Sequence, residues 1–260
     1  MKLPANCVKE IYKMNEYKAD IHLHSVLSPC GDLLMTAESV TERAKRIGID
    51  IISLTDHNSA ENAEIFQYYC EINNIMFIPG MEVETKEEIH VLTFFPDLTI
   101  LKQWQEKVYN SLPEIKNDEE FFGPQIILDC NDKYSRKNDK MLAASVNMTL
   151  SEVIKESENL KGIAVPAHLD KKKSIISQLG FIPDNLAVDT VEISKNSDPD
   201  TFRKKHNISE KINIIQNSDS HYLDDIASYI TLVMKEKSFA EFSLALQSKK
   251  GRKIKFNDIN

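Results

Sequence analysis

Six of the seven histidines in this chain stand beside a short apolar segment, at or just after its end or at its start. The seventh, His206, lies in the polar stretch RKKHN. Side chains at strand ends can converge on one face, where imidazoles and carboxylates together bind zinc and other divalent ions. The sequence therefore predicts a metal site. The six histidines are His22, His24, His57, His90, His168 and His221.

Two pairs of residues have the spacing of a chelating strand. His22 and His24 are two apart, as are Asp219 and His221. Side chains alternate across a strand, so each pair points to one side, and Asp20 shares the side of the first pair. Either pair alone also suits partly buried polar residues, because such short motifs recur by chance.

Single residues extend the predicted site. Glu82 and Glu84 close a strand after Pro79-Gly80 and share a face, so that one of them could bridge two metal ions. An exposed pair of glutamates is the alternative. His90 and His168, taken singly, are more often buried core histidines than ligands.

Asp56 and His57 end a strongly apolar strand. Asp56 is predicted to orient a metal-binding histidine, the usual task of a carboxylate behind the ligands. The alternative is a helix N-cap formed by Asp56 or Asn58, and the two roles are compatible.

The predicted ligands are too many for one tetrahedral zinc ion. They suit two or three divalent ions, such as zinc, manganese or iron. Ions that lie about 3.5–4 Å apart stabilise the attacking and the leaving oxygen in phosphoryl transfer. The residues alone thus favour phosphoester chemistry.

Short β-branched segments alternate with helical patterns along the chain. Their nearly continuous apolar character is typical of strands buried on both faces of a parallel sheet. The alternation predicts an α/β fold, either a β/α barrel or an open doubly wound sheet. No G-x-G-x-x-G or Walker A motif is present. The predicted strands are 19–23, 49–54, 75–79, 89–95, 163–167, 189–193, 212–217 and 228–234, and the predicted helices are 36–48, 59–74, 97–112 and 149–160.

One segment breaks this alternation. After the helix at 97–112, residues ~112–148 are predicted to form an insertion between strands four and five, with a hairpin at 125–135. Insertions of this kind usually border the active-site face of a barrel. The whole chain, 1–260, is predicted to be a single domain.

Composition narrows the possible partners. The net charge is −8 and the pI about 5.5. An acidic chain gains little from counterion release, so we expect no long nucleic acid as a partner and favour a small phosphorylated substrate. We expect no signal peptide at residues 1–13, no membrane span and no membrane partner. Four cysteines without a C-x-x-C pair predict a reduced, cytoplasmic setting.

The motifs, taken in order, resemble the PHP (polymerase and histidinol phosphatase) family. They are D-x-H-x-H-S at 20–25, T-D-H at 55–57, P-G-x-E at 79–82, the separate His90 and His168, and S-D-x-H at 218–221. The resemblance covers residues ~18–235. It implies a distorted (β/α)7 TIM-like barrel and a phosphoesterase site with two or three metal ions.

The resemblance also implies a ligand set. His22, His24, Glu82 and Asp219 would hold the first ion. Glu82 would bridge to a second ion, held also by His90 and His168. His57 and His221 would hold a third ion.

One position departs from the family pattern. The family adds an aspartate or histidine to the third ion seven or eight residues after the first motif histidine, where this chain has Pro29 and Cys30. We expect Cys30 to ligate as a thiolate, with Asp32 as the alternative and weak occupancy of the third position as a further one.

The expected reaction is hydrolysis of a phosphomonoester by a water that the metal ions acidify. Asp56 and His221 are the catalytic candidates, and Lys171 and Lys172, in a run with Lys173, are candidates for binding the substrate phosphate. A nuclease or nucleotide-end phosphatase acting on short oligonucleotides is the alternative. An inactive metal-binding regulatory module is the third interpretation.

Overall fold

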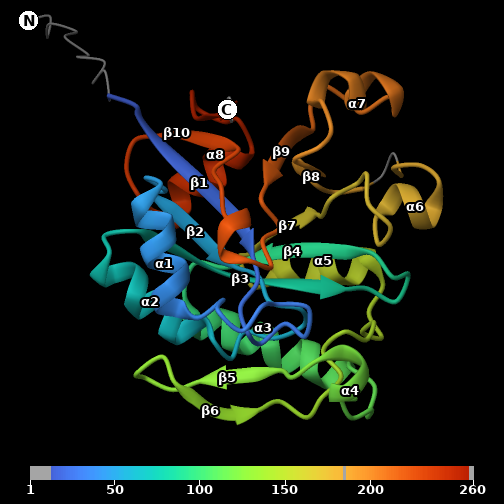
Figure 1. Ribbon diagram of the computed structural model, residues 1–260. Coiled ribbons are helices and arrows are strands. Elements are labelled where there is room, and N and C mark those ends of the chain that lie inside the picture. The colour runs from blue at the N-terminus through green and yellow to red at the C-terminus, as the bar shows by residue number, and fades with distance from the viewer. Residues whose placement is uncertain (1–12, 184–185, 258–260) are drawn as a thin grey trace, which may run out of the picture.

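The computed structural model describes residues 13–183 and 186–257 (Figure 1). Cys7 lies outside these residues. So does most of the N-terminal segment 1–13, in which we expected no signal peptide. The strands are β1 (Asn15–Leu23), β2 (Ile51–Leu54), β3 (Met76–Glu84), β4 (His90–Phe94), β5 (Ile126–Leu128), β6 (Tyr134–Lys137), β7 (Ile163–Pro166), β8 (Thr190–Ser194), β9 (Asn213–Asn217), β10 (Ile230–Met234) and β11 (Lys253–Phe256). The helices are α1 (Ala37–Arg46), α2 (Ala63–Ile72), α3 (Leu98–Ser111), α4 (Glu119–Phe122), α5 (Leu150–Asn159), α6 (Ile175–Leu179), α7 (Pro199–Lys205), the 3₁₀ turn η1 (Leu223–Asp225) and α8 (Phe239–Leu246).

The main sheet curls into a half-barrel. Its seven strands follow the order β11-β10-β1-β2-β3-β4-β7, and β8 and β9 form a separate parallel pair. This pair lies between β7 and β1, because Leu169 donates its backbone N–H to Glu192 and His24 donates to Ser220. The predicted α/β barrel-like fold is confirmed, and each of the eight predicted strands overlaps an observed one.

The expectation of a parallel sheet is wrong for several strands. β1, β2 and β3 are parallel, but β4 runs antiparallel to both β3 and β7, and β10 runs antiparallel to β1 and β11. Only five residues join β3 to β4, too few for the crossover that a parallel neighbour requires. Apolar content reports burial, not strand direction.

The alternation of side chains divides the core between the two faces of the sheet. Ile51 of β2 packs inside the half-barrel, while its neighbour Ile52 packs outside against α1 and α2. Also outside the half-barrel, Trp104 of α3 is fully buried and packs against Phe95. The four predicted helices are confirmed as α1, α2, α3 and α5, while α4 and α6 to α8 were not predicted.

Between β4 and α5 in sequence, the chain forms α3, α4 and the antiparallel β5–β6 hairpin. Figure 1 shows this hairpin below the loop that follows β1. Ile126 of β5 donates its backbone N–H to the carbonyl of Val26 in that loop (2.9 Å). A Cβ atom at Gly123 would lie 2.7 Å from the carbonyl oxygen of Pro29, so the segment before β5 also lies against the loop.

The turn between β5 and β6 caps a distant helix. The buried carboxylate of Asp132 accepts hydrogen bonds from the backbone N–H groups of Ala37 and Glu38, both at 2.9 Å. Thr36, the local N-cap of α1, accepts from the N–H of Ser39. Two residues far apart in sequence thus share the unpaired donors at the start of α1.

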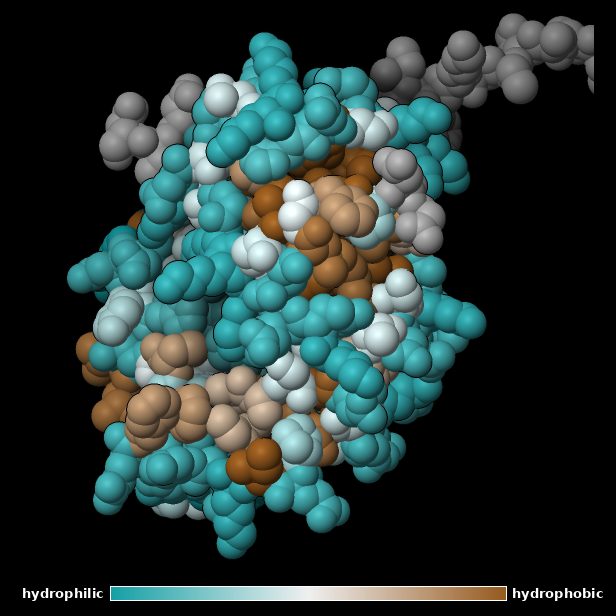
Figure 2. Space-filling view, turned by 90° about the vertical axis from the view of Figure 1, so that its right-hand side faces the viewer, coloured by the Kyte–Doolittle hydropathy of each residue, from teal (hydrophilic) through white to brown (hydrophobic). Residues whose placement is uncertain are grey.

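The face that carries α6 and α7 is largely hydrophilic, with apolar residues gathered in a patch framed by polar ones (Figure 2). Phe181, which follows α6, is 63% exposed.

Among the described residues, no helix combines the length and the apolar character needed to cross a membrane.

Replacing Asp132 by alanine is expected to lower the free energy of unfolding by about 1–2 kcal/mol, because two N–H groups of α1 lose their acceptor. Urea denaturation measures this change. Asp139→Ala, at an exposed position near the same hairpin, is the matched control. Equal stability of the two variants would contradict the capping role.

Candidate metal centre

All six predicted histidines meet at one end of the half-barrel. Five of them follow the carboxyl ends of strands or lie close to those ends. His90 instead begins β4, and the antiparallel direction of that strand brings it opposite Glu84, the last residue of β3. His90, which starts its apolar segment, therefore lies at the same end of the half-barrel as the five histidines that follow theirs.

Glu82 lies at the centre of this cluster and is almost fully buried. Its Oε1 is 2.9 Å from Nδ1 of His90 and 3.2 Å from Nε2 of His168. Its Oε2 is 2.9 Å from Nδ1 of His57 and 3.5 Å from Nε2 of His24. A carboxylate with histidines on both oxygens can bridge two positions.

Asp219 completes the other side of the cluster. Its Oδ1 lies 3.3 Å from Nε2 of His22 and 3.3 Å from Nε2 of His24. Its Oδ2 accepts from Nζ of Lys171 at 2.6 Å. The two residues of the D-x-H pair therefore make different contacts. The carboxylate of Asp219 lies beside His22 and His24, whereas the ring of His221 stacks on His24 with 4.3 Å between the ring centroids.

The spacing of these atoms fits metal coordination. At metal–ligand distances of about 2.1 Å, two ligands of a tetrahedral ion lie about 3.4 Å apart. Nε2 of His22 lies 3.2 Å from Nε2 of His24 and 3.4 Å from Oε1 of Glu82. In addition, Nδ1 of His168 is buried without a hydrogen-bond partner, and the close contacts of Oε2 of Glu82 and Nδ1 of His90 lack the geometry of a hydrogen bond. Buried polar atoms normally have partners, so these atoms fit a role as ligands.

Three groups in the described part of the chain bring their ligand atoms within 4.8 Å of one another. They share His24 and His57, so neighbouring ions would lie close together. The groups are His22-His24-Asp219, His57-Glu82-His90 and His24-His57-His221.

Cys30 lies beside the third group. Burial acts to raise the pKa of its thiol, but the nearby His57 and His221 outweigh burial and lower the pKa to about 6. The Asp32 carboxylate instead accepts from the N–H of Leu34 in its own turn (2.9 Å). The geometry thus brings Cys30, rather than Asp32, to the histidines.

Burial and opposite charges act against each other throughout the cluster. Burial favours a neutral ring at His22, but Glu192, Asp219 and Glu82 outweigh it and raise the pKa of His22 well above the ordinary value. At His24, burial and the nearby His221 and His57 lower the pKa. Burial would raise the pKa of Glu82, yet His90, His22 and His57 hold it well below its usual range.

Asp56 acts on the histidines indirectly. Its carboxylate accepts from the backbone N–H and the hydroxyl of Ser25, and from the hydroxyl of Ser28 at 2.7 Å. The Ser28 hydroxyl in turn lies 3.0 Å from Nδ1 of His24. Asp56 therefore reaches a ligand through one serine and does not hold a histidine itself.

Asp20 is directed away from the cluster. Its carboxylate accepts from the N–H and the hydroxyl of Ser218, which ties β1 to the loop that carries Asp219. Burial raises the pKa of Asp20 to about 7. The interpretation that Asp20 shares a side with the histidine pair therefore misses its role as a tie between two strand ends.

Glu84 and the lysine run border the cluster. Oε2 of Glu84 lies 3.1 Å from Nε2 of His90 and accepts from Nζ of Lys173 at 2.6 Å. Lys171 reaches Asp219, whereas Lys172 is exposed and accepts from Ser177 through its backbone carbonyl. Of the two predicted phosphate-binding lysines, the structure brings Lys171 to the cluster.

Two of the predicted ligands have an unusual backbone. His168 has φ of 28° and Asp219 has φ of 51°, in the region that non-glycine residues seldom occupy. Strain of this kind collects at functional sites, where the surrounding structure holds it in place.

Sequence reasoning missed Glu192. This buried residue lies in the middle of β8, and its carboxylate oxygens are 3.0 and 3.1 Å from Nδ1 of His22. An acidic residue within the apolar run TVEIS was the available signal, because charged side chains are rarely buried without a partner.

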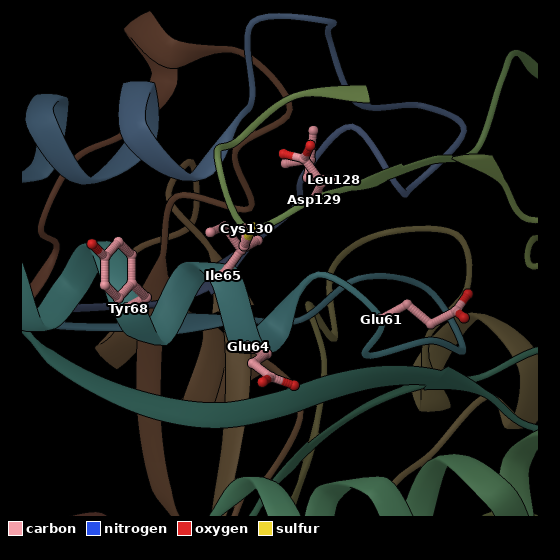
Figure 3. Close-up of a pocket in the computed structure, with 7 residues that line it drawn as sticks. All are labelled: Glu61, Glu64, Ile65, Tyr68, Leu128, Asp129 and Cys130. Atoms are coloured by element: carbon pink, nitrogen blue, oxygen red, sulfur yellow. The ribbon is translucent and has the colours of Figure 1, made fainter. Parts of the chain in front are cut away.

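The cavity in Figure 3 lies away from the histidines. It has a volume of about 520 Å³ between α2 and the end of β5, and its lining includes Glu61, Glu64 and Cys130. Glu61 pairs with Arg136, and Glu64 with Lys102 at 2.9 Å. Glu61 and Glu64 thus already have cationic partners, and the cavity contains no predicted site residue.

The chain belongs to the PHP domain family, because a model of the PHP domain matches residues 20–177. Its histidine and carboxylate groups are able to bind metal ions. A sequence search of curated proteins finds no match.

Several solved structures share the fold. The lesion-specific endonuclease Q of Pyrococcus furiosus has a TM-score of 0.69 and 22% identity, over 92% of this chain and 58% of that chain. An endonuclease Q bound to a 27-mer duplex with an abasic lesion has a TM-score of 0.67, with the same identity and coverage. A two-domain protein from Bacteroides vulgatus with a PHP-like metal-dependent phosphoesterase has a TM-score of 0.53 and 17% identity, over 94% and 66%. This chain thus spans little more than half the length of the two endonuclease chains.

The expectation of no long nucleic acid as a partner is wrong. Structures similar to this chain include an endonuclease in complex with duplex DNA. Net charge sums over the whole surface, whereas metal ions at a site supply positive charge where the phosphate lies. The net charge of −8 therefore does not exclude such a partner.

Zinc binding to the metal-free protein is expected to tighten as the pH rises from about 5.5 to about 8. The raised pKa values of His22, His57 and His90 keep protons on rings that a metal ion must displace. Affinity should therefore rise with pH until those pKa values are passed. Competition titration with a chelator measures it, and an affinity independent of pH would contradict this prediction.

Proposed function

We propose that this chain hydrolyses phosphoester bonds of a nucleic acid, using divalent ions held by the histidine cluster. The observation that carries the proposal is the position of Glu82, a buried carboxylate with two histidines at 2.9 Å, one on each oxygen. The proposed ligands are His22, His24, Glu82 and Asp219 for a first ion, Glu82, His90 and His168 for a second, and His57, His221 and Cys30 for a third.

Bound ions would acidify a water molecule and neutralise charge on the phosphate. Side chains of the protein would bind the substrate phosphate and orient the ligands. Lys171, 2.6 Å from Asp219, lies where its ammonium group can turn to a substrate phosphate. Lys172 remains a prediction without a contact to the cluster. Asp56 fixes the ring of His24 through Ser28, and so acts as a positioning residue.

We assign His221 to the third ion rather than to proton donation. Its Nδ1 lies 2.9 Å from the backbone carbonyl of Asp219, and its ring stacks on His24. A ring fixed on both sides suits a ligand, whereas a general acid must reach the leaving oxygen. Zinc, manganese and iron all remain candidates for the ions.

Two features support a nucleic acid over a small metabolite. The first is the likeness to endonuclease Q. The second is the surface beside the cluster, which exposes large apolar side chains, and the aromatic rings among them can stack on bases. The Asp32 N–H donates to the carbonyl of His221, which joins the loop that carries Leu33 and Leu34 to the loop that carries Tyr222. The exposed side chains are Leu33 (61%), Leu34 (64%), Phe121 (79%) and Tyr222 (57%).

A small phosphorylated substrate is the second candidate, since the same ions would serve. In either case we propose that chain 1–260 acts as one domain, and that the segment ~112–148 borders the substrate side. Its contacts support this, because Asn58, next to His57, donates to the carbonyl groups of Leu142 and Ala144.

Hydrolysis is tested with zinc- or manganese-loaded protein on a DNA duplex of about 20 base pairs, a mononucleotide and an aryl phosphate. We expect the duplex to turn over fastest. Asp219→Asn should lower the rate at least about a hundredfold, because it removes a charged ligand. Asp224→Asn, at an exposed position of the same loop, is the control. Faster turnover of the mononucleotide would favour the small substrate. No turnover of any ester would contradict the proposed function and favour the regulatory module.

Cys30→Ala is expected to remove one ion per chain from the zinc-loaded protein and to leave the others bound, because only the third group loses a ligand. Elemental analysis after dialysis measures the stoichiometry. Cys130→Ser, at another exposed cysteine, is the control. Unchanged zinc content in Cys30→Ala would exclude Cys30 as a ligand.

A further inference from the structure

Glu192 makes contacts that none of the proposed ligands explains. Its Oε1 accepts from Nδ2 of Asn217 at 2.7 Å, and its Oε2 accepts from the backbone N–H of His168 at 3.0 Å. Both oxygens lie within 3.1 Å of Nδ1 of His22. One buried carboxylate in β8 thus contacts His168, which follows β7, as well as His22 of β1 and Asn217 of β9.

The neighbours of this carboxylate are donors. The orientation of Asn217 is fixed independently, because its Oδ1 accepts from the N–H of Ile21 (3.1 Å), which leaves its NH₂ group for Glu192. The backbone N–H of His168 can only donate. Nδ1 of His22 therefore directs its N–H toward Glu192, which leaves Nε2, the atom that faces Glu82 and Asp219, as the one that can bind a metal ion.

The charge of Glu192 has one local partner. Within the described ranges, its only ion pair within 4.0 Å is with His22. Glu241, the other glutamate that pairs in a buried setting outside the cluster, faces the guanidinium of Arg252 directly. A buried carboxylate that makes no direct ion pair with Lys or Arg needs positive charge nearby, and an ion bound at Nε2 of His22 would supply it through the ring.

We propose that Glu192 is a positioning residue that prepares two metal positions at once. It fixes the tautomer and the direction of His22 for the first ion, and it holds the strained backbone of His168 for the second. This inference rests on the proposed metal-dependent function but concerns a residue outside the ligand set. A carboxylate behind a ligand histidine typically accounts for a 10–100-fold difference in metal affinity.

Glutamine in place of Glu192 keeps the shape but places an NH₂ group among donors. We expect Glu192→Gln to weaken zinc binding by about 10–100-fold, measured on the folded protein by competition with a chromogenic chelator. The control is Glu241→Gln, which breaks the buried pair with Arg252 far from the cluster. It should lower the melting temperature and leave the zinc affinity unchanged.

Equal zinc affinities of Glu192→Gln and the wild type would overturn the inference. So would equal losses in both variants, because general destabilisation would then explain them. If Glu192→Gln does not fold, ¹⁵N NMR of the zinc-loaded wild type decides. A proton on Nδ1 of His22 with zinc on Nε2 supports the inference, and the reverse arrangement overturns it. Zinc-loaded wild type that hydrolyses no ester would contradict the proposed function alone, since affinities are measured without turnover.

Discussion

The burial of negative charge at one end of the half-barrel is the constraint on which the site depends. Glu82 is almost fully buried, and Asp219 and Glu192 lie within 3.4 Å of the same histidine, His22. Carboxylates removed from water need positive charge and hydrogen bonds around them. Histidines provide both in the metal-free protein, by holding protons, and in the metal-bound protein, by holding ions.

Hydrogen bonds and ion pairs with the surrounding structure fix the positions of these charged side chains. Serine hydroxyls occupy the carboxylates of Asp20 and Asp56, so neither competes for the histidines. The reversed strand β4 places His90 beside Glu84, which also takes Lys173. His22, His24 and His90 thus each have a second contact that fixes the direction of the ring, and such support tunes metal sites.

Much of the fold and of the site was predictable from the sequence. Apolar segments and their spacing located eight of the eleven described strands, and two-residue spacing brought His22 and His24 together as expected. Strand direction was not predictable, because a buried antiparallel strand such as β4 is as apolar as a parallel one. Glu192 was missed because it stands inside a strand and not at its end. The expectation of no long nucleic acid was wrong because it rested on net charge, which says little about a local site.

The proposed first ion would join residues from nearly the whole length of the chain, from His22 in β1 to Asp219 after β9. No fragment that ends before β9 contains this set of ligands. The site can therefore form only when the ring of strands has closed, and any opening between β1 and β9 separates the ligands. Metal occupancy would then report closure of the ring itself, and a bound ion would oppose that opening by mass action.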